Sequence, residues 1–232
     1  MDKILELQGL TKNYSSRCAL NNLNMALPKG RIIGLLGPNG SGKTTLIKLC
    51  AGLLTPTAGN ILIDGTPVSL ETKAIVSYLP EFTYLSNWMK VSECLDYFKD
   101  FYKDFDIERA KAMLVSLNVD SEARMKSLSK GTKEKVQLVL VMSRRARLYL
   151  LDEPIGGVDP ASRDYILNTI ISNFSPESTI IISTHLITDI EKVLDDFVFI
   201  NNGQITHSGS AEAVREQTGK TIDELFREVF RC

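Results

Sequence analysis

The sequence contains little cysteine and no long apolar run. Its four cysteines, Cys18, Cys50, Cys94 and Cys232, are widely spaced and form no CxxC pair, which argues against a zinc ribbon or a disulfide framework. No stretch approaches the roughly 18 to 20 apolar residues that span a bilayer, and the opening MDKILELQGL is too charged for a signal peptide. We therefore expect a protein of the reducing cytosol that does not itself enter the membrane.

The chain also lacks a strong net charge of either sign. Lysine and arginine number 27 against 28 aspartates and glutamates, which gives a formal net charge of -1. Without a global positive field, nucleic acid is not a predicted partner. The 232 residues suffice for one domain with a sizeable core, and they contain no internal repeat or low-complexity linker. A single domain is therefore predicted.

The order of the expected elements indicates an α/β domain with a helical insertion. Short strand-like runs separated by turn residues fill the first part of the chain, and later apolar runs at 147–153 and 178–185 are typical of buried parallel strands. Between the first part of the chain and these later runs, amphipathic stretches at 91–102 and 107–119 indicate helices with no strand between them. We assign the α/β core to 1–86 and 129–210, a helical subdomain to 87–128, a hairpin within the core to 197–209, and a short helical tail to 211–232.

The stretch GPNGSGKTT satisfies the P-loop pattern and lies between a predicted strand at 31–37 and a predicted helix at 43–54. Glycines let backbone amides surround the phosphates, Lys43 adds positive charge near the terminal ones, and the Thr44 hydroxyl is a magnesium ligand. The motif therefore predicts a bound nucleoside triphosphate with Mg²⁺. The candidate phosphate-binding residues are Gly37, Pro38, Asn39, Gly40, Ser41, Gly42, Lys43, Thr44 and Thr45.

Polar side chains that end the two apolar strands are candidates for the chemistry. Asp152 and Glu153 close the run LYLLDE, where alternation along a strand would separate them, one toward magnesium and the next toward an attacking water. Acidic residues at a strand end are also common as helix caps. His185 follows STIIIST and could address a γ-phosphate, although a lone histidine there is more often a packing residue. His207 is assigned a structural or solvent-facing role.

A second anion-binding helix start is predicted at SLSKGTKEK, residues 127–135. The exposed amides and positive dipole end of a helix favour an anion. The P-loop already supplies one phosphate site, so the motif raises the question of whose anion this second site holds.

In this order the motifs resemble those of the ATP-binding subunit of an ATP-binding-cassette (ABC) transporter over essentially the whole chain. GPNGSGKTT corresponds to the Walker A motif, LYLLDE to Walker B, LSKGT to the signature, GGVDP to the D-loop with Asp159, and STH to the switch histidine. The resemblance implies an ABC-type P-loop fold with an antiparallel β subdomain and an inserted α-helical subdomain. It also implies that Tyr14 stacks on adenine. Ser129 and Gly131 would contact the γ-phosphate of ATP held by a second ABC ATPase subunit, in a homodimer or a paired heterodimer.

The chain departs from the family pattern at three positions. Lys130 and Thr132 replace a glycine and a glutamine of the signature, and Lys130 either adds charge to the site or lies in solvent. Glu81, in YLPEF, occupies the position of the Q-loop glutamine and either binds magnesium or takes up a proton. We treat Glu81 as a candidate metal ligand. The LPE form resembles a branch of the family that pairs with separate export permeases.

Aromatic residues follow Glu81 in the segment FTYLSNWM. Phe82, Tyr84, Trp88 and Met89 either belong to the core or form a partner surface. In the family, a cytosolic helix of the permease docks near this segment, which is therefore the candidate coupling site.

The predicted function is that of an ATPase, with ATP and Mg²⁺ as cofactors, peripheral to the cytoplasmic face of the cell membrane. ATP binding would close a dimer that drives a separate transmembrane permease, with export as the favoured direction. Glu153 is the candidate general base, with Lys43 and His185 as catalytic partners. One alternative is a soluble ABC ATPase acting on ribosomes or DNA, although such proteins typically carry two cassettes or coiled-coil insertions. A P-loop kinase or GTPase would not explain LSKGT or STH.

Overall fold

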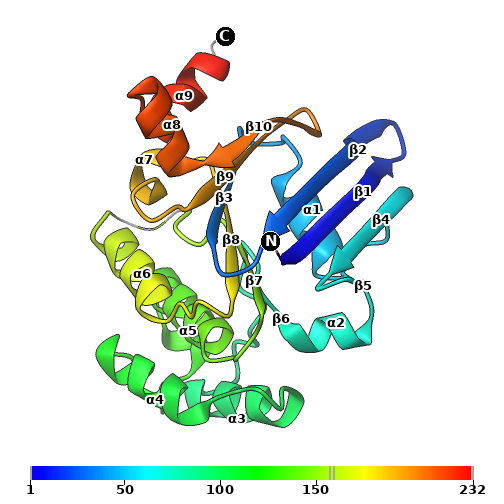
Figure 1. Ribbon diagram of the computed structural model, residues 1–232. Coiled ribbons are helices and arrows are strands. Elements are labelled where there is room, and N and C mark those ends of the chain that lie inside the picture. The colour runs from blue at the N-terminus through cyan, green and yellow to red at the C-terminus, as the bar shows by residue number, and fades with distance from the viewer. Residues whose placement is uncertain (1, 157, 159, 231–232) are drawn as a thin grey trace.

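The strands form two sheets in the computed structural model, which describes residues 2–156, 158 and 160–230 (Figure 1). The 4-stranded sheet has the order β2-β1-β4-β5 and is antiparallel. In the 6-stranded sheet, of order β10-β9-β3-β8-β7-β6, neighbours run parallel except β10 against β9. The strands are β1 (Lys3–Tyr14), β2 (Arg17–Pro28), β3 (Ile32–Leu36), β4 (Ala58–Ile63), β5 (Thr66–Pro67), β6 (Val76–Leu79), β7 (Leu148–Asp152), β8 (Thr179–Thr184), β9 (Asp196–Asn201) and β10 (Gln204–Ser210). The predicted mixed α/β fold with an antiparallel β part is confirmed.

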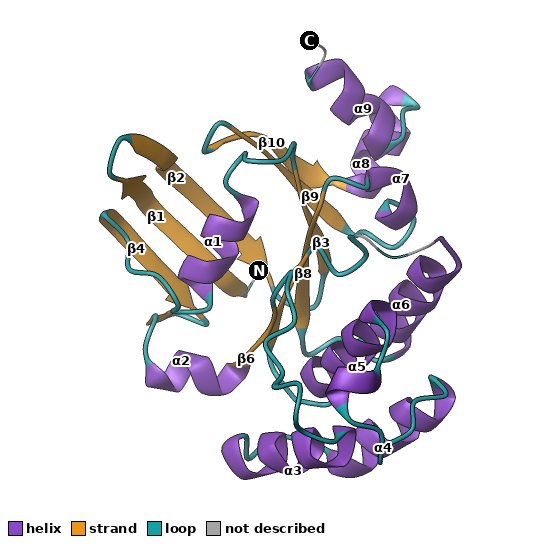
Figure 2. Ribbon diagram, turned by 180° about the vertical axis from the view of Figure 1, so that it is seen from behind, coloured by secondary structure: helices purple, strands orange, loops and turns teal. Residues whose placement is uncertain are grey.

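Helices cover both faces of the 6-stranded sheet. Figures 1 and 2 show α1 between the two sheets, whereas α3 to α6 lie on the opposite side. The helices are α1 (Lys43–Cys50), α2 (Leu70–Ile75), α3 (Val91–Phe101), α4 (Ile107–Ser116), the 3-10 turn η1 (Met125–Ser127), α5 (Lys130–Met142), α6 (Pro160–Ser172), α7 (Ile187–Ile190), α8 (Ala211–Thr218) and α9 (Ile222–Val229).

Alternation along the parallel strands divides the core between these two faces. In β7, Leu148 and Leu150 join the cluster that packs α1 against the antiparallel sheet. Tyr149 and Leu151 join the cluster beneath α3 to α6. Because both faces are buried, these strands are apolar throughout, which is the pattern that predicted them.

The connection from β3 to α1 requires glycine at two positions. A Cβ at Gly37 would lie 2.2 Å from the Ile200 carbonyl oxygen, and Gly42 has a φ of 114°. Helix α1 ends at Cys50 rather than at the predicted residue 54. Gly52 takes a left-handed conformation, with a φ of 66°, and the Leu53 amide closes the helix by donating to the Lys48 carbonyl.

The short elements β5 and α2 were not predicted. A sequence signal for α2 exists, because Ser69 accepts hydrogen bonds from the Glu71 and Thr72 amides and the Thr72 hydroxyl accepts one from the Ser69 amide. This is a capping box with threonine in place of the usual glutamate or glutamine.

Candidate functional site

The predicted site residues converge where the parallel strands β3, β7 and β8 end at the same sheet edge. A cleft of about 530 Å³ opens there. Residues predicted from separate motifs line it together: Tyr14, Asn39, Gly40, Gly42, Lys43, Thr44, Thr45, Glu81, Glu153 and His185. The cleft is thus formed by the P-loop, two strand ends and the segment after β6.

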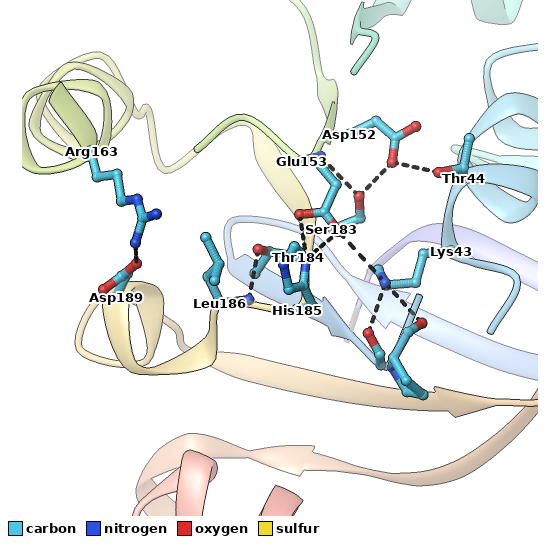
Figure 3. A network of polar contacts seen from close by, with 12 residues as sticks. Lys43, Thr44, Asp152, Glu153, Arg163, Ser183, Thr184, His185, Leu186 and Asp189 are labelled. Carbon is cyan, nitrogen blue, oxygen red and sulfur yellow. Dashed lines mark hydrogen bonds and ion pairs between the residues drawn. The ribbon is translucent and has the colours of Figure 1, made fainter. Parts of the chain in front are cut away.

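Asp152 ends β7 as a buried carboxylate, only 1% exposed, that contacts the cleft-lining residue Thr44. Its Oδ1 accepts hydrogen bonds from Ser183 Oγ at 2.6 Å and from Thr44 Oγ1 at 3.1 Å (Figure 3). Its Oδ2 is buried and has no hydrogen-bond partner among the described residues. Burial raises the pKa of Asp152 above its ordinary value, against the Ser183 and Thr44 hydrogen bonds, which lower it. A carboxylate oxygen left open beside a threonine hydroxyl matches the oxygen ligands that Mg²⁺ prefers.

Glu153 lies just beyond the strand, and its backbone turns sharply. Its φ is 49°, a left-handed conformation that costs a non-glycine residue of the order of 1 to 2 kcal/mol. The Glu153 amide donates to the Ser183 carbonyl at 3.0 Å, which fixes the turn. The carboxylates of Asp152 and Glu153 are therefore separated by this turn rather than by strand alternation.

The Glu153 carboxylate is held between two partners, as Figure 3 shows. Lys43 Nζ lies 3.6 Å from Glu153 Oε1, and His185 Nδ1 lies 3.2 Å from Glu153 Oε2. Lys43 also donates to the Gly37 carbonyl at 2.7 Å. Burial lowers the pKa of Lys43, and the charge of Glu153 opposes that shift. Lysine, glutamate and histidine thus meet at the base of the cleft.

The remaining predicted residues occupy different parts of the molecule. Tyr14 lines the cleft with 43% of its surface exposed. Ser129 and Gly131 are not among the residues that line the cleft; they lie at the start of α5, where Ser129 Oγ accepts from the Thr132 amide at 3.2 Å. Lys130, by contrast, does reach the cleft. The D-loop residue Asp159 lies outside the described residues.

Sequence reasoning missed two residues that shape the cleft. Arg17 lines it and donates from Nη2 to the Gly40 carbonyl at 2.7 Å, so it holds the P-loop from β2. Ser183 Oγ on β8 donates to Asp152 Oδ1 at 2.6 Å and accepts a hydrogen bond from the Glu153 amide at 3.1 Å. Ser183 belongs to the STH motif, but that motif drew attention only to its histidine.

The fold and the cleft define a P-loop nucleotide-binding protein, and comparisons with known proteins identify its family. The model of the ABC transporter family matches residues 20–156. The ABC transporter ATP-binding protein YdbJ of Bacillus subtilis (strain 168) is 32% identical over 97% of this chain and 75% of its own. The Nod factor export ATP-binding protein I of Rhizobium sp. (strain N33) is 28% identical over 97% of this chain and 78% of its own.

A solved structure of the ATP-binding subunit of an ABC transporter superposes with a TM-score of 0.88, at 27% identity, and covers 98% of this chain and 100% of the other. The chain belongs to the ATP-binding proteins of ABC transporters. It is an ATP-binding subunit whose ATPase activity is coupled to transport, as the sequence predicts. Within the described ranges, no helix has the length and apolar content needed to cross a bilayer.

Proposed function

We propose that this subunit hydrolyses Mg²⁺-bound ATP in the cleft with Glu153 as general base. The observation that carries the proposal is the contact of Glu153 with both Lys43 and His185 at the base of the cleft. With nucleotide present, Lys43 and the P-loop amides would hold the terminal phosphates, so Lys43 would leave Glu153 free to accept a proton from water. His185 would keep the Glu153 carboxylate oriented and contact the γ-phosphate.

Thr44 and Asp152 are the proposed magnesium-binding residues, with Glu81 as a further candidate. Oδ2 of buried Asp152, which has no hydrogen-bond partner in the part of the chain that the structure describes, supports this role. The ion would neutralise charge on the phosphates, while Tyr14 would stack on adenine and Arg17 would keep the P-loop closed around the phosphates.

Two ATP-binding subunits are proposed to enclose two nucleotides. A Cβ at Gly131 would meet no atom within 4 Å in this chain, so its own fold does not require glycine there. Together with the hydroxyl of Ser129 at the helix start, this bare backbone suits the close approach of a phosphate held by another subunit. Asp159 is proposed as a further contact across the dimer.

The partner that couples ATP hydrolysis to transport is proposed to be a transmembrane permease. We propose that the permease docks in one surface groove. The groove has a volume of about 780 Å³ and is lined by exposed aromatic residues with Lys48 and Lys73 at its edge. Tyr84, Trp88 and Met89 line it, whereas Phe82 faces the nucleotide cleft instead. The groove suits a short helix with an apolar anchor and an acidic residue.

We further propose export as the direction, from the resemblance of the LPE segment and the name of the Rhizobium relative. The subunit would lie at the cytoplasmic face of the cell membrane. We also propose that this single domain consists of a core at 1–86 and 129–210, a helical subdomain at 87–128 and a short helical tail at 211–232.

The decisive experiment replaces the proposed base. The Glu153→Gln variant should bind ATP but hydrolyse it at least about 100-fold more slowly, because the glutamine side-chain amide cannot accept a proton from the attacking water. It should therefore accumulate as an ATP-loaded dimer in size-exclusion chromatography. A wild-type turnover rate in this variant would contradict the assignment.

A further inference from the structure

A small cavity lies where helix α5 meets the loop of Glu153. It has a volume of about 20 Å³ and lies between α5, the segment after β6 and the loop after β7. The polar side chains that line it are those of Glu81, Glu134, Gln137 and Glu153, and apolar side chains complete the wall. Glu134 belongs to the stretch 127–135 and Gln137 to no motif, and neither side chain has a role in the site as described above.

The side-chain amide of Gln137 has a fixed orientation in this cavity. Gln137 Nε2 donates to the Pro80 carbonyl at 3.2 Å, and a carbonyl can only accept, so the nitrogen must face Pro80. The other atom of the amide, Oε1, is buried and has no hydrogen-bond donor among the described residues. Gln137 therefore ties α5 to the backbone next to Glu81 and leaves one acceptor unused.

Glu134 lies one turn before Gln137 and leaves a second acceptor unused. Its Oε1 lies 3.8 Å from Lys130 Nζ, at the edge of the nucleotide cleft, while its Oε2 is buried without a partner among the described residues. Glu134 therefore pairs through one oxygen with Lys130, a residue that lines the nucleotide cleft, and buries the other oxygen.

The cavity needs a hydrogen-bond donor, and a water molecule fits it best. Its polar walls are carboxylates and an amide oxygen, all of which accept hydrogen bonds. A volume above about 10 to 15 Å³ admits one water, which can donate two hydrogen bonds. The described residues contain no group of three His, Cys, Asp or Glu side chains placed to hold a metal ion.

We propose that Glu134 is a positioning residue of the ATPase site, which together with Gln137 holds one internal water that joins helix α5 to the loop of Glu153. This inference rests on the proposed role of Glu153 as the base. The signature residues Ser129 and Gly131 begin the same helix, so the water connects the signature end of α5 to the carboxylate that acts on water. Displacement of that carboxylate by a fraction of an ångström lowers catalysis without altering the P-loop.

The test compares three variants in the full-length protein. Glu134→Leu removes both acceptors of the side chain and should lower kcat roughly tenfold or more, with the KM for ATP within about twofold of the wild type. Glu134→Gln keeps an acceptor oxygen and should restore most of kcat. Glu108→Leu is the matched control, because Glu108 also pairs with a lysine on its own helix at 2.9 Å but lies on the exposed surface of α4. It should keep the wild-type kcat.

A cycle with Gln137→Leu tests the shared water. If one water joins the two side chains, the double variant Glu134→Leu/Gln137→Leu should lose little more kcat than the slower single variant, whereas independent roles would multiply the losses. Glu134→Ala, which adds no bulk, serves if leucine is not accommodated.

Three results would overturn the proposal: a wild-type kcat for Glu134→Leu and Glu134→Ala, a Glu134→Gln variant as slow as Glu134→Leu, or multiplied losses in the double variant. Glu153→Gln is measured in parallel. If that variant is inactive while Glu134→Leu is fully active, only the role of Glu134 is wrong. If Glu153→Gln retains turnover, the proposed base itself is wrong.

Discussion

Adjacent residues with the same functional group are held in opposite ways in this site. Asp152 is fixed by two hydroxyl groups and has one oxygen without a partner among the described residues, whereas Glu153 lies on a strained turn between a lysine and a histidine. The burial of the Asp152 carboxylate and the left-handed backbone of Glu153 each cost the folded state free energy. Such features are retained where binding or catalysis requires them.

Replacement of Asp152 by asparagine should therefore stabilise the nucleotide-free protein. The raised pKa of Asp152 means that the folded state holds its proton more tightly than the unfolded chain does. The free energy of unfolding therefore falls as the pH rises from the ordinary pKa of 3.8 through the raised pKa of the folded state. Above the raised pKa the loss of stability is complete. At pH 8, Asp152→Asn should raise the free energy of unfolding by about 1 kcal/mol in urea titrations with EDTA.

The higher stability of Asp152→Asn relative to the wild type should shrink as the pH is lowered toward 3.8. The same variant should lose magnesium-dependent ATP hydrolysis. Lower stability of Asp152→Asn than of the wild type at pH 8 would show that the carboxylate is stabilised by contacts other than its two hydroxyl partners.

At this scale the sequence predicts residue types better than their contacts. The P-loop and the acidic strand end are each a continuous stretch of sequence. Their residues Lys43, Thr44, Asp152 and Glu153 could therefore be selected from the spacing within each stretch. The cavity around Glu134 and Gln137 is formed by three separate segments, and only packing brings them together.

Among the elements, helix α5 connects the two proposed phosphate contacts with the interior. Its predicted start is confirmed: Ser129 is the N-cap, and the helix runs from Lys130 to Met142. The exposed amides of its first turn remain open to an anion because Ser129 caps only one of them.

Ser129→Arg should separate ATP binding from dimer closure. The arginine would fill the space that a phosphate of the other subunit is proposed to enter, while the P-loop of the same chain is untouched. We expect ATP affinity within about twofold of the wild type and an ATPase rate lowered by more than about tenfold, measured by fluorescent-nucleotide titration and phosphate release.

Ser210→Arg is the matched control for loss of a helix cap. Ser210 caps α8 in the same way, since its Oγ accepts from the Ala213 amide at 3.4 Å. Both variants should lose roughly 1 kcal/mol of stability, but only Ser129→Arg should lose hydrolysis. Weakened ATP binding in Ser129→Arg would instead place the serine in its own subunit's site.

In the whole molecule, the nucleotide cleft and the aromatic groove lie on either side of the segment after β6. Glu81 and Phe82 line the cleft, and Tyr84 and Trp88 line the groove only a few residues later. The order of the longer strands and helices was predictable because period and turn residues are local signals, whereas the short β5 and α2 were missed. The groove was not, since the same aromatic residues could equally have formed core.

Trp88→Glu should release the subunit from membranes that contain its permease. Trp88 is 66% exposed in a groove that several aromatic residues line, and a carboxylate there would repel the acidic residue that Lys48 and Lys73 are expected to attract. Val115→Glu is the control, because Val115 is 77% exposed on α4 outside the groove. Co-sedimentation with membranes should fall for Trp88→Glu alone, with ATP binding intact in both variants. An aromatic residue that is buried at an interface rarely tolerates replacement by a charged residue. If Trp88→Glu and Val115→Glu sedimented equally with the membranes, the permease would therefore contact another surface of the subunit.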